Sequence, residues 1–297
     1  MMGKLKIRFS KNYICSMKNT RWFGVIYMII ATTCFALVNT CVKFLDRFPV
    51  QELVFFRSAV SIILCLVIIR QKKLPLFGNN KKWLLIRGVF GTIALTLFFV
   101  TLQNMPMASA VAIQYLSPIF TILIASLFFK ETFKKVQIPF FILCIIGIVV
   151  LKGFDSRVSV PYLLLGISSA LFSGVAYNAI RQCRETDQPI NVVFYFPLVA
   201  LPIMGIWCLF DFVIPNQSEW WLIVIMGVFT QIAQIAMTKA LQSDTAAVIT
   251  PLKYIGAIYA IAIGSWIFDE YITLINLIGI TLILLGLLGN TLLAKRT

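Results

Sequence analysis

The chain has 297 residues, of which 60% are hydrophobic and only 12% charged, and 26 Lys and Arg against 11 Asp and Glu give a net charge of +15. A soluble domain of this length needs far more charged surface, so the composition excludes an ordinary water-soluble protein. The chain has no histidine, and its seven cysteines form no CxxC motif. We therefore expect no metal site, no cofactor and no catalytic group.

Apolar runs long enough to cross a bilayer recur along almost the whole chain. Residues 1–21 are basic and read as a retained cytoplasmic tail rather than a cleaved signal peptide. The first five predicted spans cover residues 22–44, 50–69, 83–103, 107–129 and 136–151. The next five cover residues 161–180, 190–212, 220–241, 245–268 and 272–293. The sequence thus predicts an all-α integral membrane protein of ten transmembrane helices.

The positive charges of the loops predict the orientation. Most Lys and Arg residues fall in the tails and in the loops on the side of the N-terminus. The opposite side holds only Lys43, Arg47, Lys152 and Arg157. We expect a multi-pass protein of the cell membrane with both termini in the cytoplasm, and this topology explains the basic balance without nucleic-acid binding.

The two halves of the chain resemble each other under a shift of 139 residues. The polar, glycine and charged matches mean more than those of Leu and Ile, and they include Asn39/Asn178, Gly88/Gly227, Gln103/Gln242, Tyr115/Tyr254 and Glu131/Glu270. The predicted repeats, 22–151 and 161–293, have five spans each, and an odd number inverts the second copy. Inverted repeats are typical of secondary transporters, whose sites lie between the repeats near the bilayer midplane.

Several stretches resemble the drug/metabolite transporter superfamily, in its EamA-type branch of ten spans. They are 49–57 (PVQELVFFR), 86–88 (IRG), 106–110 (PMASA), 117–118 (SP), 129–131 (FKE), 245–247 (TAA), 251–254 (PLKY) and 268–270 (FDE). The likeness covers essentially the whole chain. The second and ninth spans look like those of bacterial S-adenosylmethionine carriers, and they are also similar to animal carriers for organic anions. Other members export amino acids, so the resemblance leaves all three cargo classes open.

Three cations, Arg57, Arg87 and Lys253, fall inside predicted spans. No acidic residue lies three or four positions from any of them, where a helix would place a neutralising neighbour. A charge in hydrocarbon usually faces a polar cavity. We expect Arg57 and Lys253 to attract an anionic group of a substrate, while Arg87, nearer the inner end of its span, could instead extend to the headgroups. Glu52, about 140° around the helix from Arg57, is the one candidate coupling residue.

Proline breaks add polar candidates. Pro118 and Pro251 free backbone carbonyls in spans four and nine, and such breaks survive where they line a cavity or are packed by neighbours. Gln114 and Lys253 are matched by the shift, and a tyrosine follows each (Tyr115 and Tyr254). These side chains, and the matched Asn39 and Asn178, are candidates either for substrate binding or for contacts between helices.

Glu131 and Glu270 follow spans four and nine, and we expect them to serve as helix-start charges for the span that follows.

The combined prediction is a secondary transporter that moves a small polar metabolite with an anionic group by alternating access. The alternatives are a channel or a lipid flippase; a membrane-embedded enzyme is disfavoured because no clustered Asp and Glu or Ser–Lys arrangement is visible. The expected partners are the small-molecule substrate and the lipid bilayer, for a monomer or a homodimer.

Overall fold

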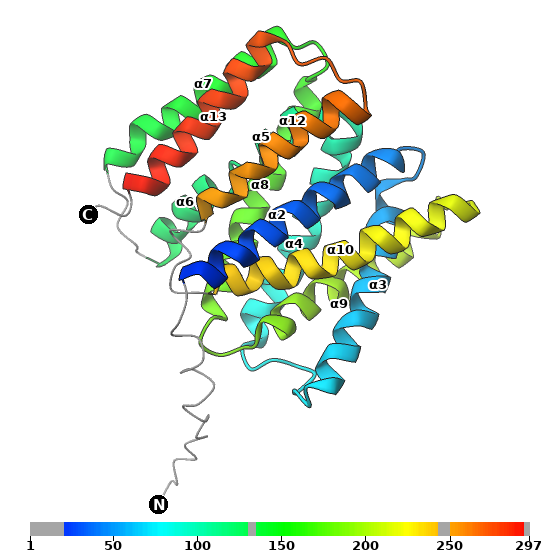
Figure 1. Cartoon of the computed structure of the whole chain (residues 1–297). Coiled ribbons are helices and arrows are strands. Elements are labelled where there is room, and N and C mark those ends of the chain that lie inside the picture. The colour runs from blue at the N-terminus through cyan, green and yellow to red at the C-terminus, as the bar shows by residue number, and fades with distance from the viewer. Residues whose placement is uncertain (1–20, 130–134, 243–249, 294–297) are drawn as a thin grey trace, which may run out of the picture.

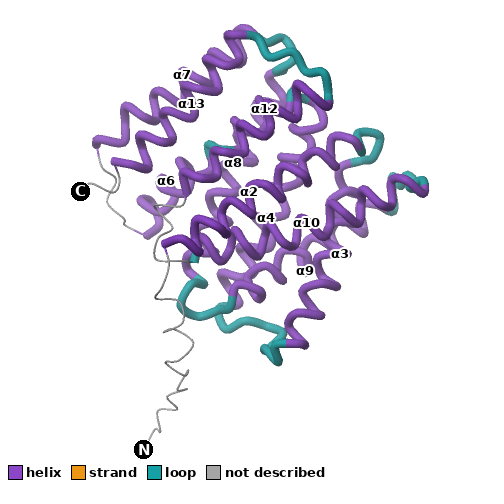
Figure 2. The backbone as a smooth tube through the Cα atoms, in the orientation of Figure 1, coloured by secondary structure: helices purple, strands orange, loops and turns teal. Residues whose placement is uncertain are grey.

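Helices account for the regular structure of the computed structural model, which describes residues 21–129, 135–242 and 250–293 (Figures 1 and 2). The first half contains α2 (Arg21–Phe44), α3 (Val50–Gln71), α4 (Lys81–Asn104), α5 (Met107–Gln114), α6 (Ser117–Phe129), η1 (Lys135–Gln137) and α7 (Ile138–Phe154). The second contains α8 (Val160–Gln182), α9 (Pro189–Cys208), α10 (Gln217–Leu241), η2 (Thr250–Tyr254), α12 (Ile255–Ile267) and α13 (Leu274–Leu293).

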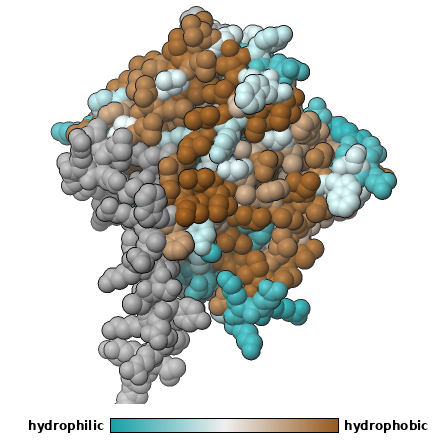
Figure 3. Space-filling view, viewed as in Figure 1, coloured by the Kyte–Doolittle hydropathy of each residue, from teal (hydrophilic) through white to brown (hydrophobic). Residues whose placement is uncertain are grey.

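These helices confirm the predicted membrane architecture. Within the described ranges, eight spans are long and apolar enough to cross a bilayer, counting α5 with α6 and η1 with α7, and the shorter apolar helices 252–267 and 274–290 complete the set of ten. Large apolar side chains remain exposed on the outside of the bundle, such as Ile142, Ile145 and Val149 of α7. Hydrophobic residues cover most of the face in Figure 3, with hydrophilic residues gathered at its ends. A bilayer is the solvent that this surface fits.

The spans differ from the predicted ones at a few ends. Helix α9 ends at Cys208, four residues before the predicted end, and residues 209–216 form a loop. A partly buried contact holds this loop, because Glu52 of α3 accepts a hydrogen bond from the amide of Val213. The predicted start of span nine, at residue 245, and the predicted basic tail apart from Arg21 lie outside the described residues.

Span four is interrupted where the proline predicts a break. Helix α5 ends at Gln114, α6 begins at Ser117, and Tyr115 and Leu116 form a turn between them. Pro118 has no amide hydrogen to donate to the Gln114 carbonyl. In span nine the described segment likewise begins in a tight 3-10 turn, η2, before α12. The two interrupted spans lie side by side, α12 along α5.

Helix pairing follows the repeat. Helix α4 packs along α8 as its equivalent α10 packs along α2, while α3 packs on its own equivalent α9 and α7 on its equivalent α13 (Figure 1). Close contacts obey the same rule. A Cβ atom built on Gly88 would lie 2.7 Å from Val199 Cγ2, and one on Gly227 would lie 2.5 Å from Val60 Cβ. Because Val60 and Val199 are also 139 residues apart, the two halves share their packing as well as their order of helices.

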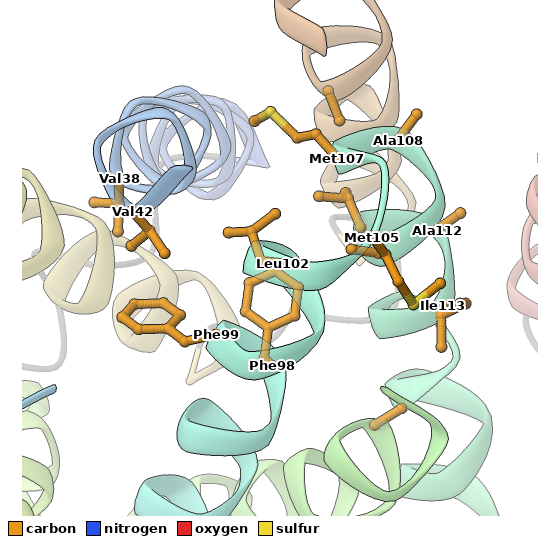
Figure 4. Close-up of a cluster of buried hydrophobic side chains, with 14 of the residues drawn as sticks. Val38, Val42, Phe98, Phe99, Leu102, Met105, Met107, Ala108, Ala112 and Ile113 are labelled. Atoms are coloured by element: carbon orange, nitrogen blue, oxygen red, sulfur yellow. The ribbon is translucent and has the colours of Figure 1, made fainter. Parts of the chain in front are cut away.

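A large apolar cluster joins α2, α4 and α5. Figure 4 shows Val38 and Val42 of α2 facing Phe99 and Leu102 of α4, with Met107 at the start of α5 nearby. All five side chains are at most 2% exposed. This cluster fixes α4 and α5, the helices that carry Arg87 and Gln114.

Ion pairs tie the two halves together at the face predicted to be outside. Lys43, at the end of α2, pairs with Glu270 in the loop between α12 and α13, and Arg47 pairs with Glu219 at the start of α10. Both carboxylate oxygens of Glu270 also accept the amide of Met107, at 3.1 and 2.8 Å. Glu270 is therefore a helix-start charge, but for α5 of the other half rather than for α13 as expected, since tertiary folding brings that helix end closer. Glu131 lies outside the described residues.

The glycine contacts give a stability prediction. Changing Gly227→Ala should lower the free energy of unfolding by roughly 1–3 kcal/mol, because the added methyl group would overlap Val60. Thermal denaturation of the detergent-purified protein measures this loss. The control is Gly153→Ala, where a Cβ would meet nothing within 4 Å, and equal melting temperatures for the two variants would contradict the packing between α3 and α10.

Candidate functional site

A cavity of about 140 Å³ lies between the two halves of the bundle. A single water needs roughly 10–15 Å³ by the same measure, so the cavity has room for several waters or a small solute. Its lining comes from both repeats, including α2, α3, α4 and α5 of the first and α8, α9, α10 and η2 of the second. Six predicted site residues contribute to it: Asn39, Arg57, Arg87, Gln114, Tyr115 and Lys253.

Arg57 is the most deeply buried charge of the cavity, with 1% of its surface exposed. Its Cζ lies 5.1 Å from the centroid of the Phe196 ring and 5.7 Å from that of Phe99. Its Nε and Nη1 are buried without a hydrogen-bond partner among the described residues. Burying an ion costs several kcal/mol, whereas a desolvated cation–π contact returns about 2 kcal/mol. The rings alone therefore leave this guanidinium undercompensated, and water or a bound anion must supply the rest.

Arg87 reaches the same ring from α4. Its Cζ lies 5.4 Å from the Phe196 centroid, and its Nη2 donates to Oε1 of Gln234 at 3.1 Å. The guanidinium occupies the space beside Gly91, where a Cβ would lie only 2.0 Å from Nη1. With 3% of its surface exposed, Arg87 does not extend to the headgroups, so that alternative is wrong. Gly91, one turn further along α4, has no side chain, and this leaves the space into which the Arg87 side chain turns.

Lys253 brings the third cation to the cavity from the opposite repeat. It lies in η2, 9% exposed, with Nζ 4.3 Å from the centroid of the Tyr177 ring. In the described part of the chain no hydrogen-bond acceptor or carboxylate contacts its ammonium group. Gln114 is its repeat mate, that is, the equivalent residue under the shift of 139. Both polar atoms of the Gln114 side-chain amide are in use, because it donates to Ser173 Oγ and accepts from Ser169 Oγ, each at 2.8 Å. Gln114 therefore fixes α5 to α8 and leaves Lys253 uncompensated.

The two predicted tyrosines differ in position. Tyr115 lines the cavity, and its hydroxyl fills the space above Gly256, where a Cβ would lie 2.0 Å from it. Tyr254 is 5% exposed and lies outside the lining, with its ring 5.6 Å from that of Tyr115 at 75°. Since the two residues are repeat mates, this edge-on contact lies close to the axis that relates the halves.

The two predicted asparagines also separate. Asn39 lines the cavity without a hydrogen-bond partner among the described residues. Asn178 lies outside the lining, where its Nδ2 donates to the carbonyls of Thr121, at 2.9 Å, and Gly174, at 3.1 Å. Asn178 therefore joins α8 to α6, which agrees with the predicted alternative of a contact between helices.

Glu52 lies outside the cavity lining and is fully buried. Its Oε1 accepts the amide of Val213, in the loop that follows α9, at 2.8 Å. Its repeat mate Asn191 donates to the Pro75 carbonyl, in the loop that follows α3, also at 2.8 Å. Helices α3 and α9 thus hold each other's loops by equivalent residues, and this reciprocal contact does not favour a coupling role for Glu52.

Among the described residues, the charged side chains that line the cavity are all positive. Its described lining contains three cations and no Asp or Glu. Sequence reasoning missed three residues that position these cations: Phe196, Tyr177 and Gln234. Gln234 carries a signal, because it is a polar residue in the middle of an apolar span. The two aromatic residues carry none, since aromatic residues are common in every span of this chain.

The asparagine pair can be tested without a ligand. Asn178→Ala should destabilise the protein by about 1 kcal/mol, because it removes a bond between helices, whereas Asn39→Ala should stay within about 0.5 kcal/mol of the parent. Thermal denaturation in detergent measures both variants. A larger loss for Asn39→Ala than for Asn178→Ala would reverse the assigned roles.

Comparison with known proteins places these features in a family. The model of the EamA-like transporter family matches residues 22–152 and again residues 160–292. The pseudopaline exporter CntI of Pseudomonas aeruginosa is 32% identical over 252 residues, which cover 82% of this chain and 87% of the exporter. An uncharacterized transporter of Helicobacter pylori is 28% identical over 90% of this chain and 94% of its own length. A solved crystal structure, 18% identical, has the same fold with a TM-score of 0.68 over 93% of this chain and 99% of that one. The chain therefore belongs to the EamA-like transporter family.

Proposed function

We propose that this protein is a secondary transporter that moves a small polar metabolite bearing a carboxylate or other anionic group across the cell membrane by alternating access. The observation that carries the proposal is the set of three buried cations around one cavity, with no carboxylate in its described lining. An intramembrane charge marks a functional site by default, and an anionic cargo supplies the compensation that the protein lacks. Amino acids, organic acids and S-adenosylmethionine-like compounds are the cargo classes considered.

The arrangement of the repeats supports alternating access. The cavity lies between two inverted halves, and rocking one half against the other exposes such a site to each side in turn. The ion pairs Lys43–Glu270 and Arg47–Glu219 join the halves at the face predicted to be outside. We assign this conformation to a state that is closed on that face.

Orientation and assembly complete the proposal. The excess of Lys and Arg on one side supports cytoplasmic termini. Each chain encloses its own cavity, so the site is compatible with a monomer or with a homodimer. The relative of 32% identity is named an exporter, which supports outward movement as the first direction to test.

A channel or a lipid flippase is the alternative function. A channel passes its solute without saturation and without exchange across the membrane, whereas a carrier shows both saturation and counterflow. Counterflow of a labelled solute into preloaded proteoliposomes separates the two. Ion pairs join the two halves at the face predicted to be outside and close that face. A closed face favours a carrier over an open pore.

Lys253 gives the functional prediction. A thermal-shift screen of carboxylates, amino acids and S-adenosylmethionine identifies the tightest ligand, and Lys253→Met should weaken its Kd at least tenfold, equivalent to about 1.4 kcal/mol. Lys239→Met is the matched control, because Lys239 also lies over a tyrosine ring, 4.7 Å from the Tyr27 centroid, but outside the cavity lining. Unchanged affinity in Lys253→Met would remove this residue from the site.

A further inference from the structure

We infer that the cargo carries at least two negative charges and no ammonium group, so that a di- or trianionic organic acid, or a phosphate of equal charge, fits the cavity better than an amino acid or S-adenosylmethionine. This inference rests on the proposed function and narrows it. It follows from how the three cations are placed, from what already occupies the polar groups around them, and from the absence of a carboxylate in the described lining.

The first anionic group is assigned to the pair Arg57 and Arg87. Both guanidinium groups lie within 5.4 Å of the centroid of one ring, Phe196, although they come from different helices. Two like charges around one ring repel each other, and the described lining holds no carboxylate to compensate them. Their planar forks suit a carboxylate or a phosphate, which can accept from more than one N–H at once. An anionic group bound near Phe196 therefore lowers the cost of burying both arginines.

The second anionic group is assigned to Lys253. Its ammonium group lies on a different ring, Tyr177, and comes from the opposite repeat. A compact ammonium with three donors takes an anion as a point charge, without the planar geometry that an arginine pair imposes. A monoanion held by the arginines leaves Lys253 without a partner, so a second negative charge is what the cavity selects.

An ammonium group on the cargo meets three cations and no carboxylate in the described lining, where only neutral groups such as the Asn39 amide could accept from it. The two glutamine carbonyl oxygens of the lining are already used, that of Gln114 by Ser169 and that of Gln234 by Arg87. Three rings of the lining already contact a cation of the protein: Phe99 and Phe196 contact arginine and Tyr177 contacts lysine. A zwitterion would thus place its positive charge among three others. The charge of the cavity therefore disfavours amino acids and S-adenosylmethionine relative to a polyanion.

Probes of one chain length test the charge rule. Butyrate, succinate and 4-aminobutyrate share a four-carbon backbone and differ in charge, and propane-1,2,3-tricarboxylate and glycerol 3-phosphate extend the anionic set. Binding to the purified full-length chain is measured by thermal shift, and counterflow of each labelled probe by proteoliposomes. We expect at least one polyanion to bind tenfold or more tightly than butyrate, and 4-aminobutyrate to produce neither a shift nor counterflow.

The outcomes separate this inference from the proposed function. If butyrate or 4-aminobutyrate binds and moves as well as the best polyanion, the charge rule is overturned while transport stands. If no anion binds or moves, the proposed function itself fails. If only glycerol 3-phosphate succeeds, the rule holds and the anionic group is a phosphate.

Variants at Lys253 add a change of specificity. Lys253→Gln, which installs the residue of its repeat mate, should reduce the preference for the polyanion over butyrate from tenfold or more to less than threefold, with butyrate affinity kept. Lys253→Glu should make 4-aminobutyrate the better ligand, because a carboxylate then faces its ammonium group. Lys239→Met should change neither preference. A folded Lys253→Gln that retains the full tenfold preference would overturn the assignment of the second anionic group.

Discussion

A positive charge buried in the membrane must be compensated, and this requirement organises the centre of the molecule. Arg57 is 1% exposed, and its described neighbours include two aromatic rings but no carboxylate. Ring contacts offset only part of the cost of burial, so this side chain is tolerable only beside a wet or occupied cavity. Arg87 and Lys253 add two further charges with the same need. The packing of the helices and the contacts between helices and loops hold the walls of that cavity in place.

The scaffold follows the repeat, whereas the site departs from it. Gly88 meets Val199 as Gly227 meets Val60, so the packing is the same in both halves. At the cavity, however, Arg57 has Phe196 as its repeat mate, and the two are in direct cation–π contact. Lys253 likewise corresponds to the neutral Gln114. The two repeats therefore share their packing, while different residues at equivalent positions make the charge of the cavity asymmetric.

The sequence predicts what depends on local length and hydropathy, and it fails where tertiary contacts decide. Ten spans, the break near Pro118 and the positions of three cations inside spans were all visible, because each leaves a mark in a short window of residues. Asn39 and Asn178 were indistinguishable, since the shift makes them equivalent, yet only one faces the cavity. The contact of Glu270 with the start of α5 joins residues 163 apart and leaves no local signal.

The origin of the cations in both repeats bears on how binding and movement are linked. Arg57 and Arg87 belong to the first repeat and Lys253 to the second, so a cargo that contacts all three contacts both halves at once. A ligand shifts a conformational equilibrium only through its different affinity for the two states. Under the proposed rocking of the halves, the distance between the arginine pair and Lys253 would change, and a cargo with one charge would not sense that change. Two linked negative charges would, because both contacts form together only at one separation of the repeats.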